Sequence, residues 1–193
     1  MQAQPEHDQR TPPTPQGGGA PQTLRIWLLG GFRVSVGSRS IREEEWHLRK
    51  KSLIKVLALS PGHHLHREQV TELLWPDLHQ EAALNNLHYA LHVARRTLEP
   101  AVLAGSSATA SRYLHLQDEQ LTLCPDSPLW VDVEAFEEAA ATARHSLQPA
   151  AFRAAIDLYS GELLPQDRYE VWAEQRRAEL RGRYLSGATS RCS

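Results

Sequence analysis

The segment from Glu81 to Leu98, EAALNNLHYALHVARRTL, constrains the fold of this chain more than any other stretch. At about 100° per residue it winds into an amphipathic helix with two different faces. The apolar face gathers Ala83, Leu84, Leu87, Ala90, Leu91, Ala94 and Leu98. The opposite face gathers hydrogen-bonding or cationic residues: Asn85, His88, Tyr89, His92, Arg95 and Arg96. This pattern predicts a helix that packs on a core by one side and presents a face suited to a DNA major groove on the other.

The distribution of charge permits a DNA contact but does not demand one. The 193-residue chain is 41% apolar and has a formal net charge of −2, which allows a core and argues against coating of nucleic acid by bulk attraction. Residues 24 to 123 carry 12 Lys and Arg against 10 Asp and Glu, together with eight of the ten histidines, whereas residues 124 to 193 carry 8 against 11. Because a polyanion favours protonated histidine, the first part becomes more cationic beside DNA.

The order of elements between residues 24 and 123 predicts a winged helix. Residues 1–23, rich in proline, glycine and glutamine, are expected to form a disordered tail. After them come a small antiparallel sheet over 24 to 41, helices over 50 to 59, 67 to 75 and 81 to 98, and a hairpin whose strands, 113 to 116 and 121 to 124, flank the turn Gln117 to Gln120. Proline and glycine end the helices, at Pro61-Gly62, Pro76 and Pro100.

Residues 124 to 193 are predicted to be helical. One helix begins at Asp132 as its N-cap, a second carries Pro149 in its first turn and stops at Gly161, and a third runs from about Tyr169 to Leu185. The expected fold class is mainly α with small β-sheets: an α+β winged helix-turn-helix, then all-α, tetratricopeptide-like helical repeats.

Three motifs resemble those of SARP-type bacterial transcriptional activators, in which an OmpR-like winged helix precedes a bacterial transcriptional activator domain. They are HLHREQVTELLWPDLHQEAALNNLHYALHVARRTLEP (64 to 100), PLWVDVEAFEEA (128 to 139) and YSGELLPQDRYEVWAEQRRAEL (159 to 180). The resemblance covers nearly everything after residue 23. In the family the helical domain continues through further helix pairs, so the resemblance implies a truncated stack with an uncovered apolar face, in a fragment or in a chain that associates.

The resemblance also implies partners. The helix at about 82 to 98 would dock in double-stranded DNA, and the hairpin wing would touch the adjacent backbone or minor groove. The loop from Trp75 to Gln80 would face RNA polymerase, through Trp75, Asp77, Leu78 and His79. Family members often bind direct repeats as head-to-tail pairs, and a homodimer through the helical domain is a further expectation.

The candidate DNA contacts extend beyond the helix at 82 to 98. Arg95 and Arg96 suit phosphates or guanine edges, and Asn85 suits adenine, although an ordinary solvated helix face remains the alternative. Arg49, Lys50, Lys51 and Lys55 form the densest basic cluster and are candidate phosphate anchors, and Arg112 is a candidate wing contact. Trp27, Phe32, Trp46 and Trp75 are interpreted as core or interface anchors. The glutamates of the helical part, among them Glu134, Glu137 and Glu179, are interpreted as solvated surface.

Other classes of protein find little support in the sequence. His88 and His92 have a metal-ligand spacing, but Tyr89 stands where a zincin needs glutamate, so we expect no metal, and we expect His63 and His64 on an exposed loop. Phosphate-loop, dinucleotide and hydrolase motifs are absent, and no enzyme or cofactor is predicted. Cys124 and Cys192, in polar surroundings, are expected as free thiols of a cytoplasmic protein. The remaining alternative is a protein interaction module without DNA binding.

Overall fold

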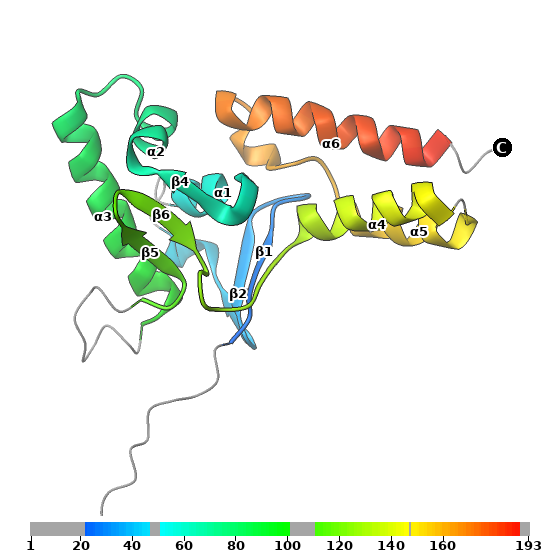
Figure 1. Cartoon of the computed structure of the whole chain (residues 1–193), viewed down its shortest axis with the longest axis horizontal. Helices are drawn as coiled ribbons and strands as arrows, with labels where there is room; N and C mark the ends of the chain where they lie inside the picture. Colours follow the sequence, from blue (N-terminus) through cyan, green and yellow to red (C-terminus); the bar gives the residue numbers. More distant parts are fainter. Residues whose placement is uncertain (1–21, 47–50, 101–110, 147, 190–193) are drawn as a thin grey trace, which may run out of the picture.

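The computed structural model describes residues 22–46, 51–100, 111–146 and 148–189. A half built from two small sheets and three helices is followed along the chain by a half built from three helices, which extends to one side in Figure 1. The expected tail lies outside the described residues, apart from Gln22 and Thr23. No described helix is both long enough and apolar enough to cross a membrane.

The first sheet has four strands in the order β3-β2-β1-β7. They are β1 Leu24–Trp27, β2 Arg33–Val36, β3 Arg39–Ile41 and β7 Leu129–Val131. The first three strands are antiparallel, as predicted for residues 24 to 41, and their alternate side chains Leu24, Ile26, Val34 and Val36 are buried. Gly30 takes a φ of +74° in the turn between β1 and β2, a conformation that favours glycine.

Three helices pack together against the core, and all three were predicted. They are α1 Lys51–Leu59, α2 Arg67–Leu74 and α3 Gln80–Leu98; short 3-10 turns occupy η1 Glu43–Glu45 and η2 Pro61–His63. At the start of α2 the Glu68 amide donates to His66 Nδ1, and the His66 amide donates to Gln69 Oε1. The predicted anchors are confirmed: Trp46 is buried, Phe32 and Trp75 pack on the core, and Trp27 lies against Trp130.

The predicted hairpin forms the second sheet together with a strand that the sequence did not indicate. The sheet is ordered β4-β6-β5, with β4 His64–His66, β5 Leu114–Gln117 and β6 Gln120–Leu123. Its turn residues Asp118 and Glu119 have φ of 49° and 67°, the left-handed pair that a two-residue hairpin turn requires. His64, expected in a loop, lies in β4 with its side chain exposed.

The second half contains α4 Asp132–Ser146, α5 Pro149–Leu158 and α6 Val171–Thr189, with a 3-10 turn at η3 Pro165–Asp167. Aromatic rings join them: Tyr159 stacks on Tyr184 at 4.4 Å and is tilted against Phe136 at 5.2 Å, centroid to centroid. Glu137 does not lie on a solvated face: its carboxylate pairs with Arg176 at 2.6 Å and Arg183 at 2.7 Å. The α-helices and the two small sheets of the described residues confirm the predicted fold class, mainly α with small β-sheets.

The two halves share the first sheet. β7 lies beyond residue 123, where the sequence suggested a domain boundary, and it pairs in parallel with β1 through Leu24 to Leu129 and Ile26 to Val131. At the end of β7 the buried carboxylate of Asp132 accepts hydrogen bonds from the amides of Leu28 and Leu29, each at 2.9 Å. Burial raises the pKa of Asp132, and these hydrogen bonds oppose that rise. The strand pairing and the carboxylate tie the start of the helical half to β1.

Three residues lie in surroundings that differ from the sequence interpretation. Lys55, a candidate phosphate anchor, is wholly buried and pairs with Asp167 of η3 at 2.5 Å, so that prediction was wrong. His63, expected on an exposed loop, is 16% exposed and lies 3.1 Å from the Glu134 carboxylate of α4. Cys124, expected in polar surroundings, is buried, and burial raises the pKa of its thiol to about 12. In the first two cases the reason is the helical half, which covers this side of α1 and η2.

Candidate nucleic-acid interface

Helix α3 lies at one edge of the molecule in Figure 1, and the side chains of its predicted polar face are mostly exposed. Its apolar side chains are buried from Ala83 to Leu98, except that Leu84 is half-buried, and Val93 joins them. The exposed positions include Asn85, Asn86, His88, Tyr89, His92 and Arg96. The exposed Tyr89, with 55% of its surface accessible, is a large ring on a surface that otherwise carries hydrogen-bonding groups. This face has the chemistry needed to contact base edges and phosphates.

Arg95 differs from the other residues of this face because it also forms a hydrogen bond to a strand of the second sheet. Its Nε donates to the Leu114 carbonyl of β5 at 3.0 Å, and the residue is only partly exposed. Burial lowers the pKa of the Arg95 guanidinium, whereas nearby Glu99 raises it. Arg95 therefore links α3 to the wing, and Arg96 is the exposed arginine of the pair.

The C-terminal end of α3 is held by two residues that sequence reasoning missed. Arg39 of β3 donates from Nη2 to the carbonyls of Thr97 and Leu98, at 2.9 and 2.8 Å. These carbonyls belong to the last helical turn, where a cation is favourable. An arginine 58 residues upstream gives no periodic signal, so sequence reasoning had nothing with which to find it.

Glu99 fastens the start of the wing to the same end of α3. Its buried carboxylate accepts from Ser111 Oγ at 2.5 Å and from the Arg112 amide at 3.0 Å. Charge-assisted hydrogen bonds of this kind are among the stronger ones in proteins. Glu99 thus holds together the two ends of the segment 101–110, which is outside the described residues. In the sequence, the only signal for this contact of Glu99 with the wing is its position, as an acidic residue directly before Pro100.

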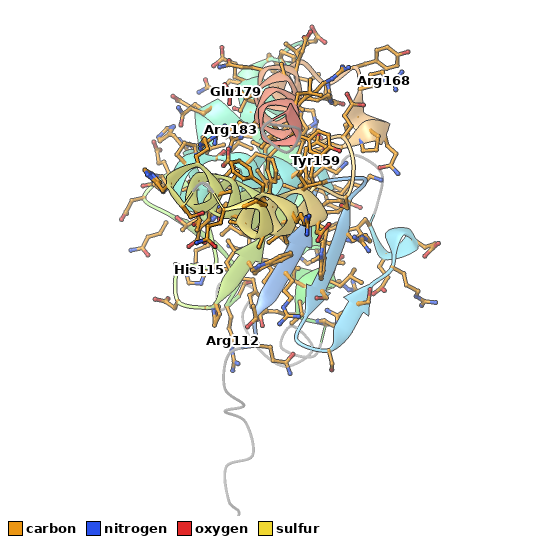
Figure 2. The ribbon with its side chains drawn as sticks, turned by 90° about the vertical axis from the view of Figure 1, so that its right-hand side faces the viewer. Arg112, His115, Tyr159, Arg168, Glu179 and Arg183 are labelled. Atoms are coloured by element: carbon orange, nitrogen blue, oxygen red, sulfur yellow. The ribbon has the colours of Figure 1, made fainter. Side chains whose placement is uncertain are left out.

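The wing carries Arg112 and His115 near its base and its acidic residues at its tip. Arg112 is exposed at the start of the wing and His115 is half-buried on β5, both low in the view of Figure 2. At the tip, the Glu119 carboxylate pairs with Arg67 of α2 at 2.5 Å and lies 3.3 Å from His66 Nε2. Asp118 is exposed beside this ion pair at the tip, whereas Arg112 is exposed at the base, so the base of the wing is the better match for a DNA backbone.

The loop between α2 and α3 lies between two hollows. One, of about 380 Å³, is lined by Leu74, Trp75, Pro76, Asp77, Leu78, Asn86 and Tyr89. The other, of about 510 Å³, lies between the same loop, α2 and the start of α6. Leu78 is 41% exposed, Asp77 and His79 are exposed, and Trp75 is partly buried. Leu78 and the exposed Tyr89 both line the first hollow, and together they form an apolar surface suited to a protein partner.

The remaining candidates are placed as follows. Lys51 is half-buried in the first turn of α1, while Arg49 and Lys50 lie outside the described residues. His88 and His92 are both exposed on α3. Within the described ranges no three His, Cys, Asp or Glu side chains come close enough together to hold a metal ion.

The comparisons with known proteins support the fold. No protein-family model matches the sequence, and no curated protein matches it. The structure is similar to that of Mycobacterium tuberculosis EmbR in complex with a low affinity phosphopeptide, with a TM-score of 0.65 and 17% sequence identity. The similarity covers 88% of this chain and 45% of the EmbR chain, so this chain spans less than half of that length. The similarity shows that the two chains share a fold, in which a winged helix is followed by packed helices.

Proposed function

We propose that the protein is a sequence-specific DNA-binding transcriptional regulator that reads DNA with α3. The observation that carries the proposal is the exposed face of α3, where Asn85, His92 and Arg96 point away from a helix that Arg39 and Glu99 hold in place. The resemblance of the three motifs to SARP-type activators and the fold shared with EmbR support it.

The contacts divide by chemistry. Asn85, His88, Tyr89, His92 and Arg96 of α3 reach base edges or phosphates, and Arg95 contributes while it holds β5. Lys50, Lys51 and Arg112 neutralise phosphates on either side of the groove. Because the formal net charge is −2, binding depends on this local cluster and not on bulk attraction.

The test is selection of a binding site from random duplexes, followed by footprinting. On the selected site we expect Arg96→Ala and Asn85→Ala each to weaken binding by about 1 to 3 kcal/mol if the contact is bidentate to a base. Arg144→Ala, at an exposed arginine near the end of α4, is the matched control and should leave affinity unchanged. A common sequence that both α3 variants bind as tightly as the native chain would contradict this assignment of α3.

RNA polymerase is the second partner in the proposal, and it would meet the loop that carries Trp75, Asp77, Leu78 and His79. The exposed Leu78 and the hollow beside Trp75 favour this side of the molecule. In transcription reconstituted with purified polymerase on the selected site, we expect Leu78→Ser to reduce activation without reducing DNA affinity. Equal loss of affinity and activation would place Leu78 in the DNA interface.

A protein interaction module without DNA binding is the alternative function. The hollows beside Trp75 favour it, since they suit a protein partner better than a polyanion. A failure to enrich any sequence, together with a flat response of duplex binding to salt, would support it. DNA binding through phosphates predicts a slope of about −0.9 in log affinity against log salt for each neutralised phosphate.

A further inference from the structure

One face of the first sheet carries arginines and tryptophans. Alternate side chains of a strand point to opposite faces of its sheet, and Leu24, Ile26 and Val34 point to the core. The other face, called the outer face, is made by Arg25 and Trp27 of β1, Arg33 and Ser35 of β2, Ser40 of β3 and Trp130 of β7. Because these four strands contain no aspartate or glutamate, the outer face is cationic.

The strand register brings the cationic and aromatic groups of the outer face together. Arg25 lies beside Trp130 in the parallel pair of β1 and β7, and Trp27 lies opposite Arg33 in the antiparallel pair of β1 and β2. The Arg33 guanidinium lies 5.4 Å from the centroid of the Trp27 ring, and the Trp27 and Trp130 ring centroids are 5.4 Å apart. Because contact with the ring restricts the guanidinium, its planar fork of N–H donors is preorganised for an oxyanion.

The arginines of the outer face are exposed, whereas the two tryptophans are half-buried beside them. Within the part of the chain that the structure describes, neither Arg25 nor Arg33 pairs with a carboxylate. The charge of Arg33 opposes the rise in the pKa of Asp132 that burial causes, but the Asp132 carboxylate itself is bound by backbone amides. Both guanidinium groups can therefore bind an anion from outside.

The outer face points away from α3. The core side of the sheet belongs to the same buried cluster as Leu87 and Leu91 of α3, so the outer face lies on the opposite side of the sheet from this helix. In Figure 1, α3 lies at one edge of the molecule, and α4 begins at the end of β7 and extends to the other side. A duplex docked on α3 therefore leaves Arg25 and Arg33 uncovered.

The surroundings of the tryptophan rings favour carboxylates over nucleotide bases. A base that binds by stacking needs the open face of an aromatic ring. The Trp27 ring already has Arg33 over it and Trp130 beside it, and both tryptophans are only partly exposed. Carboxylates match the exposed arginines, because a guanidinium binds a carboxylate through two parallel hydrogen bonds. The half-buried rings also lower the local dielectric constant, which strengthens such a pair.

We propose that the outer face binds an acidic segment of a protein partner, in which aspartate or glutamate carboxylates pair with Arg25 and Arg33 beside the Trp27 and Trp130 rings. This surface is separate from the polar face of α3. The proposal therefore goes beyond DNA reading and does not rest on it.

The probe for the test is a fluorescein-labelled oligoglutamate peptide, and its binding to the full chain is measured by fluorescence anisotropy at low ionic strength without DNA. We expect the native chain to bind the peptide, and the double variant Arg25→Gln/Arg33→Gln to raise the dissociation constant about tenfold, because it removes two charge-assisted pairs. The matched control is Arg144→Gln/Arg153→Gln, at exposed arginines of α4 and α5, which changes the net charge equally and should bind like the native chain. Far-UV circular dichroism checks that both double variants are folded.

The indole N–H signals of the tryptophans locate the peptide. In heteronuclear NMR spectra assigned with single Trp→Phe variants, we expect oligoglutamate to shift the signals of Trp27 and Trp130 and to leave that of the buried Trp46 unchanged. A native chain that does not bind the peptide, or an equal loss of binding in both double variants, would overturn the proposal. It would also be wrong if an oligothymidylate strand shifted the same two signals and bound more tightly than the peptide, since the occupant would then be a nucleic acid. Arg96→Ala should bind oligoglutamate like the native chain, so a failure of DNA reading by α3 can be told apart from a failure of this proposal.

Discussion

Replacing Lys55 by methionine tests whether this lysine is part of the core or an anchor for DNA. The substitution keeps the length of the side chain and removes its charge. In the structure Lys55 is wholly buried, its Nζ lies 2.5 Å from Asp167 Oδ2, and it lies 5.0 Å from the centroid of the Phe32 ring. Burial lowers the pKa of Lys55, and Asp167 partly restores it. The lysine therefore stabilises the fold mainly by neutralising a carboxylate in the interface between the two halves.

The size of the effect follows from what each substitution leaves behind. Breaking a buried ion pair by removing one partner costs about 3 to 5 kcal/mol. Because the Asp167 side chain is still 13% exposed, we expect Lys55→Met to lower the free energy of unfolding by about 3 kcal/mol, near the lower limit. Asp167→Asn should cost more, since it leaves an ammonium group that has no exposed surface. The double variant should lie within about 1 kcal/mol of the native chain, because replacing both charges is often nearly neutral.

The lowered pKa of Lys55 also determines how the stability of the protein depends on pH. A lysine whose pKa is lowered in the folded state disfavours folding while it carries its proton, so stability rises with pH between the folded pKa and the ordinary value of 10.5. The loss caused by Asp167→Asn should therefore shrink as the pH is raised towards 10.5. Urea unfolding of the four chains, followed by far-UV circular dichroism, measures both the free energies and their pH dependence.

The same variants distinguish the core role of Lys55 from a phosphate contact. If Lys55 touched DNA, Lys55→Met would reduce the salt slope of DNA binding by about 0.9 in magnitude and leave stability unchanged. We expect the reverse, with an unchanged slope under conditions where the variant is folded. A Lys55→Met chain that is as stable as the native protein would refute the burial argument.

Three further predictions concern stability and reactivity. Asp132→Ala should lower the free energy of unfolding by about 2 to 4 kcal/mol in urea titrations, because the amides of Leu28 and Leu29 lose a buried acceptor. Because the pKa of Asp132 is raised in the folded state, the native chain should also lose stability relative to Asp132→Asn as the pH rises above 3.8. A stability difference between these two chains that does not change with pH would argue against this. Gly161→Ala should destabilise by about 1 to 3 kcal/mol in the same assay, since φ is +155° and the new Cβ would lie 2.9 Å from Gly30 Cα; a neutral effect would show that the backbone relaxes there. In a Cys192→Ser background, Cys124 should resist iodoacetamide at pH 8 until urea unfolds the chain, because burial raises the pKa of its thiol to about 12. Mass spectrometry measures the labelling, and rapid labelling of the folded chain would contradict this prediction.

Local sequence patterns were sufficient to predict the helices, most of the strands and the two faces of α3. Periodicity and chain breakers act within a few residues of where they stand, so Pro61-Gly62, Pro76 and Pro100 were enough to place helix ends. The apolar pattern of the helix at 81 to 98 likewise revealed which side would be buried. The polar face of α3, and with it the candidate site, could be found in this way because its residues lie on one helix.

Which polar groups face solvent and which make contacts in the interior depends on residues that are far apart in the sequence. Lys55 meets Asp167 across 112 residues, Asp132 meets Leu28 across 104, and Arg39 reaches the end of α3 across 58. A charged side chain in a helix pattern looks the same whether water or a distant carboxylate neutralises it, so local sequence cannot tell Lys55 from Lys51, or Arg95 from Arg96. The parallel pairing of β7 with β1 brings the helical half onto α1, and the desolvation that follows turns Lys55 from a predicted DNA contact into part of the core.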